Sequence, residues 1–160
     1  MLYFVLKFLH VIGAAVLLGT GAGIAFFMLM AHRTGDARIV AATARIVVRA
    51  DYLFTATAVV AQPVTGLLLA RSVGYSLTEG WILASIALYL VTGAFWLPVV
   101  WMQSQMRDLA AAAADAGTSL PERYRRLYRL WFAFGFPAFD AVMLIFWLMI
   151  TRPPIEWLTL

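Results

Sequence analysis

The chain has 160 residues, of which 64% are hydrophobic and 12% are charged, and its mean hydropathy is +0.88. A soluble domain of this size would be about half apolar and about a quarter charged, so these values exclude a water-soluble protein and indicate one embedded in lipid. The sequence holds no cysteine, which excludes disulfides and thiolate-ligated metals, and its net charge of +4 lies in connections beside apolar segments, which favours lipid headgroups over nucleic acid as the partner.

Four long apolar runs define the membrane spans, and Asp140 is the one charged residue inside them. They cover residues 8–32, 52–70, 80–106 and 130–151. Each has the length of about 20 residues that a helix needs to cross about 30 Å of hydrocarbon. A backbone in lipid must satisfy its own hydrogen bonds, so the spans are helices.

We therefore predict an all-α integral membrane protein in which a single domain, residues 1–160, forms an antiparallel four-helix bundle. The predicted helices cover about 3–31, 37–71, 80–116 and 120–151.

Local signals mark where two of these helices meet their connections. Gly35 suits the residue after a helix end and Asp36 suits the N-cap of the next helix. Ser119 and Glu122 match the two polar positions of a capping box, which predicts that the last helix opens there.

The basic residues predict the orientation. Nine of the twelve Lys and Arg residues fall in the connections 33–49 and 107–129, and only Lys7, Arg71 and Arg152 lie toward the other side. The positive-inside rule places both basic connections in the cytoplasm and both termini outside.

Each predicted helix carries a stripe of polar or small residues at about 100° per residue, and we expect the four stripes to face inward. The stripes are Lys7, His10, Gly13 and Thr20; Asp51, Thr55, Gln62 and Gly66; Ser85, Tyr89, Thr92, Trp96 and Gln103; and Asp140, Met143, Leu144 and Trp147. Gly19 and Gly23 form a small-residue ridge that favours helix packing and association with a second copy or a partner subunit.

Five of these polar residues fall at similar depths in the outer half of the membrane, counted at about 1.5 Å per residue from the helix ends. They are Lys7, His10, Gln62, Tyr89 and Asp140. Ionisable groups inside a membrane are functional candidates, so this layer is the predicted cofactor site.

Haem b is the most concrete cofactor for this layer. His10 can supply one axial imidazole, and Lys7 can meet a propionate or act as a second ligand. The chain has two histidines, which excludes a pair of bis-histidine haems. His32 lies 22 residues further on, about 33 Å along a helix, and cannot share a haem with His10.

Three other interpretations remain open. Asp140, His10 and Gln62 can form a proton or metal relay, or the polar layer can be packing glue in a non-catalytic accessory subunit. A third is a soft Cu(I) site of Met28, Met30, His32, Met102 and Met106, although Met28 and Met30 point about 200° apart. No hydrolase or phosphate-loop motif is present.

The segments 6–13 (Leu-Lys-Phe-Leu-His-Val-Ile-Gly), 18–33, 62–66 (Gln-Pro-Val-Thr-Gly) and 96–103 resemble a bacterial family of predicted integral membrane proteins of unknown function, over nearly the whole chain. The Lys-x-x-His opening is more distantly similar to copper-resistance D proteins and HemJ-type protoporphyrinogen oxidases. In the HemJ type a histidine of the first helix is implicated in haem binding, which this resemblance carries over to His10 alone. The chain has Phe27-Met-Leu-Met30 where HemJ has Tyr-Leu-Pro-Arg.

Residues and resemblance together predict a bacterial inner-membrane protein with periplasmic termini. Its expected function is haem binding or membrane oxidoreduction, with His10 as axial and metal ligand.

Overall fold

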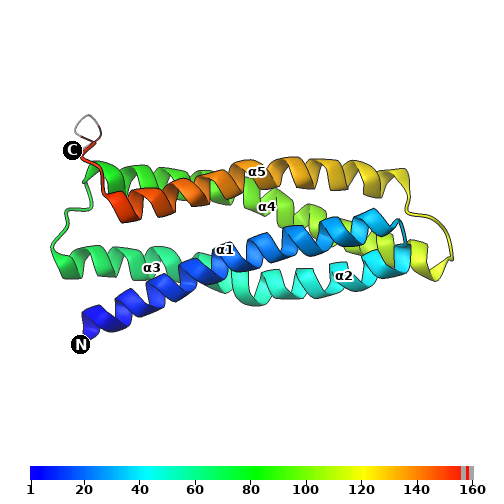
Figure 1. The fold of residues 1–160 in the computed structure, drawn as a ribbon, viewed down its shortest axis with the longest axis horizontal. Coiled ribbons are helices and arrows are strands. Elements are labelled where there is room, and N and C mark those ends of the chain that lie inside the picture. The colour runs from blue at the N-terminus through cyan, green and yellow to red at the C-terminus, as the bar shows by residue number, and fades with distance from the viewer. Residues whose placement is uncertain (156–157, 159–160) are drawn as a thin grey trace.

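The computed structural model describes residues 1–155 and residue 158, and within them it confirms the predicted all-helical bundle (Figure 1). Its elements are α1 (Leu2–Thr34), α2 (Ala37–Ala50), the π-helical turn η1 (Asp51–Thr55), α3 (Ala56–Val73), α4 (Gly80–Asp115) and α5 (Glu122–Thr151). The run from α2 through η1 to α3 is one continuous second span, so four helices have the length and composition to cross a membrane.

The helices lie antiparallel, and the N-terminus and the end of α5 are at the same end of the bundle (Figure 1). The opposite end holds the α1–α2 and α4–α5 connections with their arginines, and we call it the basic end. The end that carries the termini is called the outer end.

The main apolar core lies toward the basic end, where α2 packs against α1 and α4, and α5 packs against α4. Its most deeply buried side chains include Met28, Val40, Met106 and Tyr124. In α2 the arginines are exposed while alanine and valine, three or four residues apart, are buried, which is the pattern of an amphipathic helix.

Toward the outer end the bundle consists of two pairs, with α3 packed on α1 and α4 packed on α5. Few side chains are buried there. At the tip, Arg152 follows α5 and donates a hydrogen bond from Nη1 to Tyr75 Oη at 2.6 Å, which joins the α3–α4 connection to the end of α5.

One predicted helix boundary is confirmed and another is wrong. Gly35 is left-handed with φ 68°, and the Asp36 side chain accepts from the backbone N–H groups of Arg38 and Ile39 at 2.7 and 3.4 Å. At the other connection, α5 begins at Glu122 with Pro121 as N-cap, and Ser119 lies exposed outside the helix. A proline disfavours helical geometry in the residue before it, so the helix cannot start at 120.

Two expectations about helix faces also need correction. Met143, Leu144 and Trp147, predicted to face inward with Asp140, are 44%, 51% and 63% exposed. The buried face of α5 instead carries aromatic and small residues, which fill the space against α4. A side-chain carbon at Gly19 would meet nothing within 4 Å, so the Gly19–Gly23 ridge is not a packing surface for the described part of this chain.

Candidate functional site around His10

His10 is held between α1 and α3 by a side-chain hydrogen bond whose direction can be assigned. Its Nδ1 lies 3.0 Å from Thr65 Oγ1, and the Thr65 hydroxyl lies 2.8 Å from the Ala61 carbonyl oxygen. Because a threonine hydroxyl has one proton, which it donates to the carbonyl, its oxygen accepts from His10 Nδ1–H. In the neutral imidazole this arrangement leaves the lone pair on Nε2.

The imidazole also interacts with the Gln62 backbone carbonyl, and among the described residues no well-formed hydrogen bond is made to Nε2, which is not sealed inside the protein. An imidazole with one nitrogen bound to the protein and the other left free is the usual state of a histidine ligand to a metal. The arrangement therefore presents a single, oriented nitrogen ligand.

Gln62 fixes the same region from the other side. Its side-chain amide donates to the His10 backbone carbonyl at 2.8 Å, and the residue is 9% exposed. Gly13 lies opposite, where an added side-chain carbon would clash with Gln62 Nε2. The contact between α1 and α3 is close because residue 13 has no side chain.

Gly66 makes room for the imidazole ring itself. A side-chain carbon at this position would lie 3.0 Å from His10 Cε1, closer than ordinary van der Waals contact. We refer to His10, Gln62 and Thr65, with Gly13 and Gly66 beside them, as the His10 site.

Two other residues of the predicted layer are not brought to His10. Lys7 is exposed, and its Nζ lies 5.6 Å from the centre of the Tyr3 ring, one turn away on α1. Asp140 is exposed on α5 and forms no ion pair with the described residues. The predicted layer thus contributes His10 and Gln62 to the site.

Tyr89 contacts α3 but at a different level. Its hydroxyl donates to the carbonyl oxygen of Val59, six residues or about 9 Å along α3 from Thr65. The Phe95 ring of α4 contacts the Phe134 ring of α5, so these two residues lie at the same depth in the antiparallel pair. Tyr89 lies six residues before Phe95 and Asp140 lies six residues after Phe134, so Tyr89 and Asp140 are also at about the same depth. The single layer expected from the sequence is therefore two levels, with His10 nearer the outer end.

A second buried polar group was not among the predicted site residues. Asp51 begins the π-helical turn and is only 5% exposed, and Thr55 is 6% exposed. The Thr55 hydroxyl and the Trp96 indole N–H interact with the Asp51 carboxyl, but neither makes a well-formed hydrogen bond to it. A carboxyl group thus lies in the middle of the bundle with two incompletely satisfied neighbours.

The sequence carried a signal for Asp51 because this residue shares a stripe with Thr55, Gln62 and Gly66. The predicted site nevertheless does not include Asp51, because a charged residue predicts the end of a membrane span. The π-helical turn, which lets the second span carry the carboxyl inward, leaves no simple mark in the sequence.

The residues of the soft Cu(I) interpretation lie mostly in apolar surroundings. Met28, Met102 and Met106 are core residues that are at most 4% exposed. The His32 ring stacks on Tyr128, with 3.6 Å between ring centres. Among the described residues, no group of three or more His, Asp or Glu side chains is placed to hold a metal ion.

Comparison with known proteins agrees with the membrane architecture. The model of a family described as predicted integral membrane proteins (DUF2269) matches residues 4–153. No curated protein and no solved structure shows a significant match to the chain. The more distant similarity to copper-resistance D and HemJ-type proteins stays a prediction. With four membrane-spanning helices and a family match over almost its whole length, the chain belongs to the DUF2269 family of integral membrane proteins.

Proposed function

We propose that this membrane protein binds one haem b through His10 and serves in one-electron redox chemistry. The observation that supports the proposal is the hydrogen bond from His10 Nδ1 to Thr65, which leaves Nε2 as an oriented, accessible ligand nitrogen. A lone histidine suits a haem with one protein ligand better than a bare metal ion, which would need several.

The residues around His10 fit this cofactor in three respects. The neutral imidazole can bind iron without first losing a proton. Lys7 lies one turn toward the outer end, exposed, where its ammonium group can pair with a propionate. Gly66 has no side chain, which lets the imidazole ring lie directly against α3. When bound, the haem iron would supply the one-electron step between its ferric and ferrous states.

The other polar residues would hold together the helices that position His10. Gln62 ties α3 to the backbone of α1 at His10, so the ligand's position depends on the packing of these two helices. Tyr89 ties α4 to α3 through the Val59 carbonyl and so joins the two helix pairs. Asp140 has no role in this proposal because it lies on an exposed face at another level.

The same proposal places the protein in a bacterial inner membrane with the basic end in the cytoplasm. The support is the concentration of arginines in the α1–α2 and α4–α5 connections. The His10 site would then lie in the periplasmic half of the membrane, on the side from which an exported electron donor or acceptor arrives.

Thr65→Val should lower the affinity for haem by about 10- to 100-fold, the usual effect of losing the partner that orients a metal-bound histidine. Valine keeps the shape of threonine but cannot accept from Nδ1–H. Titration of the purified protein with hemin, followed by absorption in the Soret region, measures the change. Thr65→Ser, which keeps the hydroxyl, should restore binding. Equal affinities for the valine and serine variants would contradict the orienting role.

A second candidate function is a proton relay, and the buried Asp51 favours it. A carboxyl group in the middle of a membrane bundle is costly unless it is protonated or paired, and such groups commonly mark proton pathways. Asp51 sits on a π-helical turn, a feature frequently found at functional sites, beside Thr55 and Trp96. In this reading Asp51 takes the place that the sequence had given to Asp140.

Asp51→Asn should reduce proton flux into proteoliposomes at least tenfold if the relay is correct, because an amide cannot exchange a proton and proton relays contribute about 10²–10⁴-fold to rates. The flux is measured with a pH-sensitive dye trapped in the vesicles under an imposed membrane potential. Asp140→Asn is the matched control, since it changes an exposed carboxyl group in another span, and it should leave the flux unchanged. Wild-type flux in the Asp51 variant would exclude the relay.

A further inference from the structure

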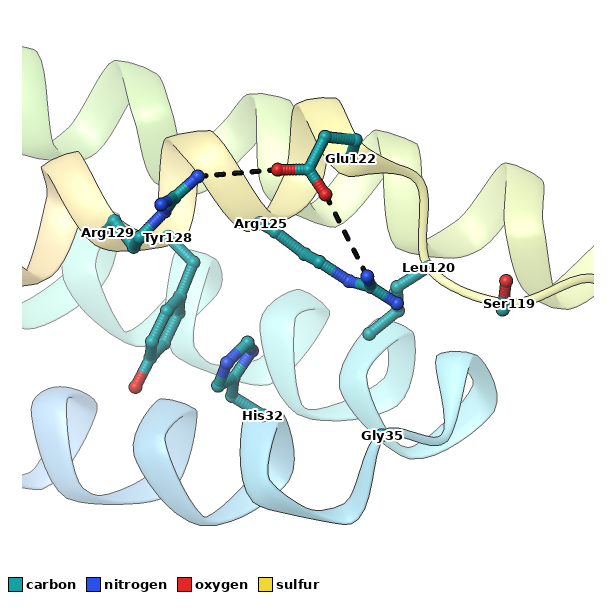
Figure 2. Close-up of a pocket in the computed structure, with 8 residues that line it drawn as sticks. All are labelled: His32, Gly35, Ser119, Leu120, Glu122, Arg125, Tyr128 and Arg129. Atoms are coloured by element: carbon teal, nitrogen blue, oxygen red, sulfur yellow. Dashed lines mark hydrogen bonds and ion pairs between the residues drawn. The ribbon is translucent and has the colours of Figure 1, made fainter.

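A pocket of about 520 Å³ opens at the basic end of the bundle, away from the His10 site. Figure 2 shows it between the end of α1, the α4–α5 connection and the first turns of α5. His32 comes from α1, and Glu122, Arg125, Tyr128 and Arg129 come from α5. The pocket lies where two membrane spans end, because the apolar runs 8–32 and 130–151 meet the basic connections there.

The electrostatics of the pocket favour an anion. Glu122 faces both arginines, with Oε2 3.8 Å from Arg125 Nη1 and Oε1 3.3 Å from Arg129 Nη2 (Figure 2). One carboxylate therefore pairs with two guanidinium groups, and the Arg125 and Arg129 side chains remain 57% and 72% exposed. Each guanidinium has five N–H donors, so most of the donors stay free for a ligand. Phosphate oxygens match these forked donors well.

The wall beneath the arginines is aromatic. The His32 and Tyr128 rings stack with 3.6 Å between centres and 11° between planes, and the Tyr124 ring lies 5.8 Å from His32. His32 Nδ1, Tyr124 Oη and Tyr128 Oη are buried without a hydrogen-bond partner among the described residues. These three atoms are enclosed by the aromatic wall, so the donors that a ligand can reach are those of the arginines at the rim.

An apolar surface continues from this wall along α5 into the membrane span. Phe132 stacks on Tyr128 at 6.1 Å between ring centres, and Phe136 packs edge-on against Phe132 at 5.1 Å. These two phenylalanines are 38% and 56% exposed. The three rings are four residues apart, so they line one face of the helix below the arginines.

We propose that this pocket binds the phosphate of an anionic phospholipid, with Arg125 and Arg129 holding the headgroup and Phe132 and Phe136 contacting an acyl chain. A basic recess directly above an exposed apolar strip matches a molecule with a charged head and a hydrocarbon tail. A free phosphate ion would contact only the arginines and would make no use of the exposed Phe132 and Phe136 rings. The arrangement therefore favours a phospholipid over free phosphate.

Native mass spectrometry of the full chain in detergent, titrated with phosphatidylglycerol, tests the proposal. Arg125→Gln and Arg129→Gln should each weaken lipid retention about tenfold, the size expected from losing a charge-assisted hydrogen bond. Arg126→Gln is the matched control, because Arg126 is exposed on the same turn but does not line this pocket. It should keep wild-type retention. An equal loss in the Arg126 variant would overturn the proposal in favour of general attraction to the basic end.

Two further variants test the contributions of the lipid headgroup and of the acyl chain separately. Glu122→Gln should strengthen phosphatidylglycerol binding, because the internal anion that competes for both arginines is removed. Phe136→Ala should weaken binding of the long-chain lipid while leaving that of a short-chain phosphatidylglycerol unchanged. Inorganic phosphate that displaces the lipid at equal concentration, or equal retention of phosphatidylcholine, would contradict a site for anionic lipid.

Discussion

His10→Ala should abolish the Soret absorption of the purified protein after reconstitution with hemin. The alanine removes the only imidazole that the structure holds ready for iron near the outer end, with Nδ1 bound to Thr65 and Nε2 free. Lys7, one turn away on α1, has its Nζ over the Tyr3 ring and is assigned to a propionate in this account. The measurement is the absorption spectrum of both proteins at equal concentration.

His32→Ala is the control for this change. It removes the other histidine of the chain, which lies about 33 Å away along α1 and stacks on Tyr128. The Soret band should persist in this variant. Added imidazole should restore part of the band in His10→Ala by filling the vacated position. Full haem occupancy in His10→Ala without imidazole would show that another group binds the iron.

Gly66→Leu should have the second-largest effect, with loss of haem binding and a lower melting temperature. The first atom of any side chain there would lie 3.0 Å from His10 Cε1, and leucine adds three more carbons in the same direction. Overpacking of this kind costs about 1–3 kcal/mol, and it would push the ring out of reach of Thr65. Thermal unfolding followed by circular dichroism and hemin titration measure the two effects.

Gly19→Leu makes the same substitution on α1 at a position with open space, because nothing lies within 4 Å of a side-chain carbon there. It should leave haem affinity and the melting temperature of the monomer unchanged. If Gly66→Leu binds hemin like wild type, the position of His10 in the structure is incorrect.

The architecture followed from the sequence because lipid imposes strict rules on length and charge. The long apolar runs correspond to the four spans, and Gly35 and Asp36 act as the predicted stop and start. The start of α5 was misplaced because Ser119 has the right spacing for a cap, while Pro121 prevents the intervening residues from being helical.

The site was predictable where two polar residues lie on helices that pack directly. His10 and Gln62 share a contact because α1 and α3 form one of the two pairs. Asp140 lies on α5, outside the α1–α3 pair, and at a different depth from His10. Counting residues from the helix ends gives a depth but does not show which helices are in contact. Thr65 was missed because a threonine in a membrane helix commonly bonds to its own backbone, which it also does here.

The central claim is that His10 holds one haem per chain, and hemin titration of the purified wild-type protein tests it most directly. The account predicts a Soret band that rises linearly and saturates at one hemin per chain, with a redox-dependent spectrum. A protein that shows no Soret band after hemin is supplied would contradict it.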